Sequence, residues 1–218
     1  MGVVKKIILK RIDSKSANAF VKKWHYSGKV VSNSQLHFGA FLNNRLHGVL
    51  SYGPSINKKG TVNLVTGTKW DEFIELNRMA LDNVLPKNSE SRCLAISIKL
   101  IKKHIPRIKW IISFADATQS GDGAIYRATG FHLLQIRKNE ALRVNPANGK
   151  PMHIIQSSHL SIPSREFRSW KALVGFQLKY VYFINKESKK HLTCDIIPYS
   201  KIKEMGIQMY KGERVCCN

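Results

Sequence analysis

Apolar and polar residues follow two distinct periods along most of this chain. Periods near two predict strands, and apolar positions three and four apart predict helices. The predicted strands cover residues 3–12, 35–42, 45–52, 73–81, 108–114, 131–137 and 180–184. Helices are predicted over 14–24, with Ser14 or Ser16 as the cap, from about residue 89 to His104, and just before Gly130.

The order of these elements predicts the fold class. Strand, helix, hairpin, strand, helix, strand, helix and strand imply an α+β fold, with a mixed, mostly antiparallel central sheet flanked by helices. Asn43-Asn44 separates two strands and tolerates positive φ, which predicts a tight hairpin. We expect one catalytic core over residues 1–138. Residues 139–218 are richer in turns and are expected to form a strand-and-loop extension packed on the same domain.

The net charge then narrows the class of partner. Lys and Arg total 36 against 14 Asp and Glu, a formal charge of +22. Residues 14–70, 91–115 and 141–165 contain no acid at all. Such stretches favour phosphate contacts, so double-stranded DNA is the expected partner. No apolar run approaches the roughly 18 residues that span a bilayer, and we expect no membrane partner.

Cysteine usage and the amino-terminal segment favour the cytoplasm. Cys93, Cys194, Cys216 and Cys217 form no C-x-x-C pair, so no disulfide framework is predicted. Adjacent cysteines at a chain end also make poor zinc geometry. The first residues read as a strand and not as a signal peptide. We therefore expect a protein that acts in a reducing, cytoplasmic compartment.

Residues 111–131 contain the first candidates for chemistry. A buried strand ends in Asp116, a Gly-rich turn follows, and a short helix carries Tyr126 before Gly130. Ligands of open α/β sheets bind at the carboxyl ends of strands. Asp116 could act as a base, orient a substrate or bind metal; alternatively, it caps the helix. Tyr126 could be a general acid, or a tyrosine packed at a helix–sheet seam.

A second candidate lies in the strand predicted over residues 73–81. Arg78, between apolar neighbours, could stabilise an oxyanion or hold a phosphate. Its alternative role is an ion pair with Glu72 or Glu75. A regular strand would place Glu75 and Arg78 on opposite faces, which argues against the second pair. Glu75 and Tyr52 are weaker site candidates.

Two further groups are polar residues at helix ends. Lys87, Ser89, Ser91 and Arg92 surround the start of the helix that ends at His104, where they could bind phosphate or simply cap it. His25-Tyr26 follows the end of the first helix, where a histidine can also just complement the helix dipole.

The closing motif Tyr126-x-x-x-Gly130-Phe131, together with the element order, resembles the GNAT superfamily of N-acetyltransferases. In that superfamily the tyrosine often protonates the departing thiolate of coenzyme A. The superfamily's Gly-rich loop, R/Q-x-x-G-x-G/A, has no counterpart here. Residues 83–91, NVLPKNSES, take its place. The chain therefore departs from an ordinary acetyl-coenzyme A enzyme.

A more specific resemblance covers about residues 20–135. The segments HYSG (25–28), GVLSYGP (48–54), ELNRMA (75–80), PKNSES (86–91) and FAD (114–116), with the Tyr126 motif, resemble the phage Mom family. The resemblance implies conversion of adenine in duplex DNA to N6-(methylcarbamoyl)adenine, which shields phage DNA from host restriction. It also implies a phage-encoded enzyme, a coenzyme A thioester such as acetyl-CoA, and iron.

The resemblance implies a role for each candidate. Arg78, Asp116, Tyr126 and Tyr26 would be catalytic. Lys87, Ser89, Ser91 and Arg92 would bind the cofactor, and His25, Tyr26 and Asp116 would hold the metal. Two other functions stay open at this point: an ordinary acetyl-CoA-dependent N-acetyltransferase, and a non-catalytic DNA-binding protein on the same scaffold.

Overall fold

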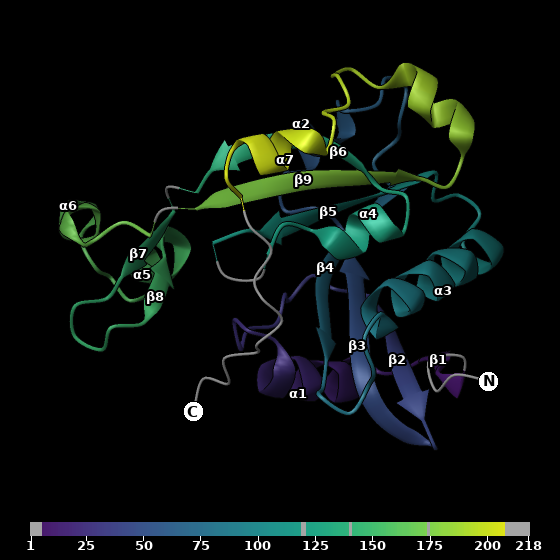
Figure 1. Ribbon diagram of the computed structural model, residues 1–218, viewed down its shortest axis with the longest axis horizontal. Coiled ribbons are helices and arrows are strands. Elements are labelled where there is room, and N and C mark those ends of the chain that lie inside the picture. Colours follow the sequence, from purple (N-terminus) through teal and green to yellow (C-terminus); the bar gives the residue numbers. More distant parts are fainter. Residues whose placement is uncertain (1–5, 119–120, 140, 174, 208–218) are drawn as a thin grey trace.

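A computed structural model describes residues 6–118, 121–139, 141–173 and 175–207. Its centre is a seven-stranded sheet in the order β1-β2-β3-β4-β5-β9-β6 (Figure 1). The strands are β1 (Ile8–Arg11), β2 (Leu36–Leu42), β3 (Arg45–Gly53), β4 (Phe73–Leu81), β5 (Trp110–Asp116), β6 (His132–Lys138) and β9 (Phe176–Phe183). Only β4 and β5 are parallel neighbours in this sheet. The predicted mixed, mostly antiparallel sheet is confirmed.

Helices cover both faces of the sheet. They are α1 (Ser14–Trp24), α2 (Lys58–Val62), α3 (Ser89–His104), α4 (Ala124–Ala128) and α7 (Ser200–Glu204), with a 3₁₀ helix η2 (Lys186–His191). Val49 of β3 packs with Ala17 and Val21 of α1, whereas its neighbours Leu50 and Tyr52 pack on the other side with α3. We call these sides the α1 face and the α3 face.

Local signals explain where these elements begin and turn. Asn43 and Asn44 have φ of 50° and 60°, so the predicted hairpin turn is confirmed. The predicted cap of α1 was wrong. Asp13, not a serine, caps the helix, and its Oδ1 accepts a hydrogen bond from the Ser16 N–H at 2.8 Å.

Strand β4 contains a β-bulge that its sequence did not reveal. Ser51 of β3 lies opposite Arg78 and Tyr52 lies opposite Leu76, so Asn77 is an extra residue without a cross-strand partner. The extra residue restores Arg78 to the face that Glu75 occupies. The expectation that these two side chains lie on opposite faces was therefore wrong.

The parallel pair β4–β5 separates along its length. Pairing runs from Phe73↔Trp110 to Leu76↔Ser113 and stops there, although β4 continues to Leu81 and β5 to Asp116. Beyond Leu76 and Ser113 the two central strands are no longer joined by hydrogen bonds. Side chains from both faces of the sheet can reach this separation.

Residues between β6 and β9 form a lobe that projects from the body of the molecule (Figure 1). It consists of β7 (Leu142–Val144), β8 (Pro151–His153), α5 (Ile154–His159) and α6 (Ser164–Ser169). Leu142, Met152 and Phe167 are its buried apolar residues. None of these elements was predicted. The boundary at residue 138 stays a prediction. The strand predicted over 180–184 falls largely within β9, which lies between β5 and the edge strand β6.

We expect the protein to fold without this lobe. Lys138 of β6 lies opposite Phe176 of β9, and the Asn139 N–H donates to the Gly175 carbonyl at 2.9 Å. A two-residue Asn-Gly turn in place of residues 140–174 should therefore close a hairpin between β6 and β9. Circular dichroism and thermal denaturation should show a single cooperative transition. Loss of that transition would show that the lobe belongs to the folding unit of the core.

Among the described helices, none combines the length and apolar character needed to cross a bilayer.

Candidate active site

Arg78 lies beside the bulge of β4, on the α1 face. Its Nε donates to the Lys29 carbonyl at 2.9 Å, and its Nη1 donates to the Asn77 carbonyl at 2.7 Å. These two bonds use two of about five N–H donors of a guanidinium. They fix the plane of the group and join the segment after α1 to β4. Burial lowers the pKa of Arg78, while Tyr26 and Glu75 oppose that shift.

Glu75 shares this face with Arg78 and lies within its electrostatic range. Burial raises the pKa of the Glu75 carboxyl group, and contacts with polar neighbours and Arg78 offset part of that rise. A carboxylate held in this way has a stronger affinity for a proton than an exposed one. Glu75 is therefore suited to accept a proton from a substrate. The sequence analysis favoured Asp116 for this role and treated Glu75 as a weaker candidate.

His25 and Tyr26 lie on the same side, at the end of α1. The Ser27 N–H donates to His25 Nδ1 at 3.2 Å, and the Ser27 hydroxyl lies 2.8 Å from the same nitrogen. Burial, and next the positive charge of Arg78, lower the pKa of His25 to about 3. The imidazole is therefore neutral with its proton on Nε2. Tyr26 packs on it at a ring distance of 4.3 Å and is 48% exposed.

This neutral histidine predicts a pH dependence of stability. Its folded-state pKa is depressed from 6.5 to about 3, so the unfolded chain binds one more proton between those values. The stabilisation is present above pH 6.5 and is lost as pH falls toward 3. We expect the free energy of unfolding of the His25→Gln variant to depend less on pH than that of the wild-type protein between about pH 3 and pH 6.5. Parallel curves for both proteins in urea titrations would contradict the burial of a neutral His25.

Tyr126 reaches the separation between β4 and β5 from the α3 face. Its side chain is 7% exposed; the hydroxyl accepts a hydrogen bond from Ser113 Oγ at 2.9 Å and lies 3.4 Å from the Phe114 carbonyl. Burial raises the pKa of Tyr126 to about 12, and Tyr26 and Glu75 contribute in the same direction. The electrostatic range of Tyr126 thus includes two groups of the α1 side. A phenol with this pKa keeps its proton at neutral pH.

Asp116 is held at the root of the lobe. Its Oδ1 accepts hydrogen bonds from the Thr118 N–H at 3.0 Å and from Asn139 Nδ2 at 3.3 Å. Asp116 thus holds the turn directly after β5 and does not cap α4, whose N-cap is Gly123, so the predicted helix-capping alternative was wrong. His153, from β8 of the lobe, lies within electrostatic range of both Asp116 and Lys29. These hydrogen bonds tie Asp116 to the root of the lobe. Arg78, Glu75, His25 and Tyr26 are linked by electrostatic interactions and ring packing, and we call these four residues the Arg78 group.

The start of α3 offers only part of the predicted phosphate site. Ser89 is fully buried and its hydroxyl donates to the Pro86 carbonyl at 2.6 Å. The Ser91 hydroxyl donates to the Asn88 carbonyl at 3.1 Å. A hydroxyl that gives its proton to a carbonyl cannot also donate it to a phosphate oxygen. Exposed Lys87, half-buried Arg92 and the amides of the first turn are the donors suited to an anion.

The residues proposed for iron do not fit a metal. Within the described part of the chain, no three His, Cys, Asp or Glu side chains gather as metal ligands. His25 Nδ1 already accepts a hydrogen bond, and its Nε2 carries the proton, so neither nitrogen offers a lone pair. Asp116 Oδ1 is engaged at the root of the lobe. We therefore assign no step to iron.

Tyr52 and the cysteines do not join the site. Tyr52 is fully buried, its hydroxyl lies 2.6 Å from Ser97 Oγ, and burial raises its pKa. Cys93 is buried and Cys194 is exposed, both as free thiols, while Cys216 and Cys217 lie outside the described residues. The sequence analysis did not identify Lys29, Ser113 and His153 as neighbours of the candidate site residues. Ser113 could have been noticed as the one polar residue within the apolar run before Asp116.

The arrangement of the sheet and its helices defines a protein of the N-acetyltransferase fold. Arabidopsis thaliana NAA60, solved in complex with acetyl-CoA, superposes with a TM-score of 0.53 at 13% identity, covering 82% of this chain and 99% of that one. The spermidine/spermine N-acetyltransferase SpeG from Vibrio cholerae gives a TM-score of 0.52 at 8% identity, covering 87% of this chain and 99% of that one. At these identities the similarity establishes the fold alone.

The sequence model of the Mom protein family matches residues 6–201, and the chain belongs to this family. The protein called methylcarbamoylase mom, from Escherichia phage Mu, is 30% identical over 195 residues. That alignment covers 85% of this chain and 80% of the phage Mu protein. The resemblance inferred from the sequence is thereby confirmed.

Proposed function

We propose that this protein transfers a methylcarbamoyl group to the N6 amino group of adenine in duplex DNA, and that it is a phage enzyme whose product protects DNA from restriction in the host cytoplasm. The observation that supports this most strongly is the 30% identity to a methylcarbamoylase over 85% of the chain. The +22 charge supports a polyanionic substrate.

The Arg78 group supplies the polar chemistry on the α1 side of the separated strands. Arg78 is a fixed cation suited to a developing negative charge on a carbonyl oxygen or to a phosphate. Glu75, with its raised pKa, is suited to take a proton from the adenine amino group. Tyr126 retains its proton and is suited to give it to a leaving group from the α3 side. Tyr26, half exposed, can contact the base.

We propose a coenzyme A thioester as the cofactor. Support comes from the separation of β4 and β5 beyond Leu76 and Ser113, and from NAA60, whose structure contains acetyl-CoA. The donors at the start of α3, namely Lys87, Arg92 and first-turn amides, would hold its phosphates. A thioester that already carries the methylcarbamoyl group would supply an activated carbonyl and a thiol leaving group. Asp116 and His153, at the root of the lobe, would position the substrate.

The adenine N6 atom lies on the major-groove edge of a base pair. Chemistry on that atom between Arg78 and Tyr126 requires the base to leave the stack, at a cost of a few kcal/mol. The basic surface would offset that cost through phosphate contacts.

Expression in bacteria tests the proposal. Total DNA is digested to nucleosides, and mass spectrometry searches for a deoxyadenosine carrying the added methylcarbamoyl mass. A deoxyadenosine heavier by an acetyl group instead would indicate an ordinary N-acetyltransferase acting on DNA. Unmodified DNA, in cells where the folded protein binds DNA, would favour a DNA-binding protein without catalysis.

A further inference from the structure

The two most exposed large apolar side chains in the described part of the chain both lie in the connection between β3 and β4 (residues 54–72). Ile56 is 76% exposed and Trp70 is 69% exposed. They stand near the two ends of this connection, which begins after Gly53, and Gly53 lies opposite Glu75 in the sheet. Lys58 Nζ lies 5.8 Å from the centre of the Trp70 ring. Both apolar side chains therefore lie at the end of the β3–β4 pair where Glu75 is found.

The connection shares the α1 face with the Arg78 group. Val65 packs in one cluster with Phe73 and Ile112. Phe73 lies two residues before Glu75 on the same face, and Ile112 lies beside Glu75 in the register of β4 and β5. Helix α1 contacts β2, β3 and β4 on this face. The Arg78 group therefore lies between α1 and the connection, and a base that approaches Glu75 from this face must pass between them.

The residues on either side of Ile56 are anchored. Ser55 is buried, and its hydroxyl lies 3.0 Å from Thr61 Oγ1. Burial raises the pKa of Glu75, and a hydrogen bond from Ser55 is the largest contribution in the opposite direction. Asn57 caps α2, and its Oδ1 accepts a hydrogen bond from the backbone of the first turn at 3.0 Å. Ile56 is thus held between two fixed residues, beside the site, with its own side chain exposed.

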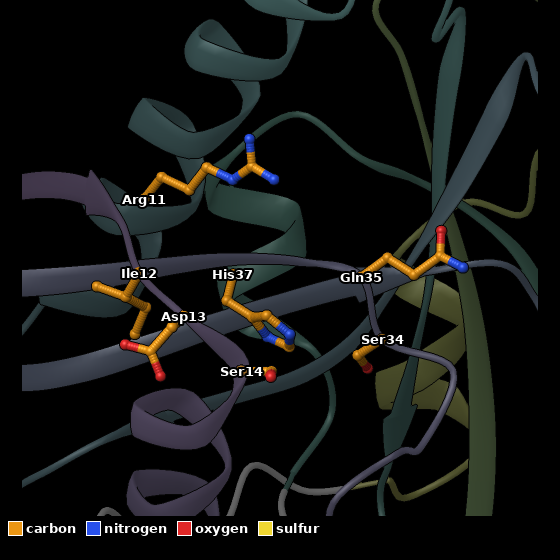
Figure 2. A pocket seen from close by; sticks show the side chains of 7 residues that line it. All are labelled: Arg11, Ile12, Asp13, Ser14, Ser34, Gln35 and His37. Carbon is orange, nitrogen blue, oxygen red and sulfur yellow. The ribbon is translucent and has the colours of Figure 1, made fainter.

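The segment before β2 supports the same part of the connection. Asn33 Nδ2 donates to the Pro54 carbonyl at 2.9 Å, and the Ser34 hydroxyl donates to Asn77 Oδ1 at 3.0 Å. Figure 2 shows Ser34 where it borders the hollow at the start of α1. The backbone that leads to Ile56 is therefore preorganised, which lowers the entropy cost of using this side chain in binding.

Lysines accompany this exposed apolar pair. Residues 54–70 contain no acid. The Thr66 N–H donates to the His191 carbonyl at 2.9 Å, which brings η2 beside the connection. The exposed lysines of the two segments are Lys58, Lys59, Lys69, Lys186, Lys189 and Lys190. A DNA duplex, in which phosphates flank an apolar base stack, is complementary to such a surface.

We propose that Ile56 enters the base stack of DNA and fills the place that the target adenine leaves. Proteins that unstack a base step insert an apolar wedge, and isoleucine is one of the residues used. Ile56 adjoins Ser55, the neighbour of Glu75. Trp70 is instead followed by two acids, which repel phosphates. This inference rests on the proposed function for the identity of the extruded base.

Fluorescence of 2-aminopurine tests the wedge directly. This base is quenched within a duplex stack and brightens when it leaves the stack. Random-sequence duplexes, in which it replaces adenine throughout, are saturated with the full-length protein. We expect the wild-type protein to raise the emission, and Ile56→Ala to lower the ratio of extruded to stacked base roughly tenfold, the factor expected for loss of a buried aliphatic side chain. Equal emission with both proteins, or no rise with the wild type, would overturn the proposal.

Val84→Ala supplies the matched control. Val84 is 61% exposed and follows the far end of β4, so this change also shortens an exposed aliphatic side chain. It should leave the emission at the wild-type level, and neither variant should change the thermal midpoint. Ile56→Leu should retain the emission, because leucine is also used as a wedge. Size-exclusion chromatography tests the other partner, a second copy of this chain: a changed oligomeric state of Ile56→Ala with unchanged emission would overturn the proposal.

The cellular assay separates this inference from the proposed reaction. Ile56→Ala should lower the modified deoxyadenosine roughly tenfold at equal protein levels, whereas Val84→Ala should not. If cells contain methylcarbamoyladenine and Ile56→Ala changes neither its yield nor the emission, the wedge alone fails. If the emission depends on Ile56 but wild-type cells contain no modified adenine, the wedge stands and the proposed reaction fails.

Discussion

Replacement of Arg78 by alanine should nearly abolish the modified deoxyadenosine. The guanidinium is fixed by bonds to the Lys29 and Asn77 carbonyls, and it is the one cation of the Arg78 group. Loss of a preorganised donor at a developing negative charge typically costs a factor of about 10² to 10³ in rate. Nucleoside mass spectrometry, at equal levels of expressed protein, gives the ratio of modified to unmodified deoxyadenosine.

Two controls separate this role from general effects. Arg107→Ala removes the same charge from an exposed position and should leave the yield unchanged. Thermal denaturation of Arg78→Ala measures any loss of stability caused by removal of the hydrogen bond between Arg78 and the Lys29 carbonyl. A folded Arg78→Ala protein that modifies DNA at the wild-type level would refute the assignment.

Replacement of Tyr126 by phenylalanine should reduce the modified nucleoside by roughly a hundredfold, because proton transfer by a positioned acid contributes at least about that factor. The change removes one hydroxyl and leaves the ring packed against Phe131 and Tyr180. The raised pKa of about 12 keeps the phenol protonated throughout the physiological range. The same cellular assay measures the loss.

Tyr52→Phe provides a matched control. Tyr52 is likewise buried on the α3 face, and its hydroxyl is likewise bonded to a serine, Ser97, at 2.6 Å. Both variants should lose a similar amount of stability, about 1 kcal/mol for one hydrogen bond. Only Tyr126→Phe should lose modification. If both lose it equally, the effect comes from packing and not from proton transfer.

Most of the core fold could be predicted from hydrophobic periodicity. The range predicted for β4 was that observed, and the hairpin between β2 and β3 follows from Asn43-Asn44, since asparagine tolerates positive φ. The lobe between β6 and β9 was missed because its strands are three residues long and its helices six. Segments this short do not contain enough residues to show a hydrophobic period. The insertion of β9 between β5 and β6 depends on pairing between distant parts of the chain, which periodicity does not report.

The candidate site was predictable by residue type but not by grouping. Arg78, Tyr126 and His25-Tyr26 were chosen from motifs, and the structure places Arg78, Tyr26 and His25 together. Glu75 was undervalued because the bulge at Asn77 cannot be read from alternation. Ser89 and Ser91 were chosen as free hydroxyls, but a serine near a helix start often bonds to the backbone nearby, as both do here.

The extra residue in β4 also has an evolutionary consequence. Without Asn77, Leu76 would be followed directly by Arg78, and every other side chain of the strand would keep its present side. Deletion of Met79 instead would turn the side chains on one side of the deletion to the opposite face of the sheet. Side chains that are now buried would then leave their present packing. Deletion of Asn77 would therefore preserve the orientation of every other side chain in this strand, but it would also remove the carbonyl that accepts a hydrogen bond from Arg78 Nη1. Relatives that lack this residue should need another acceptor for Arg78.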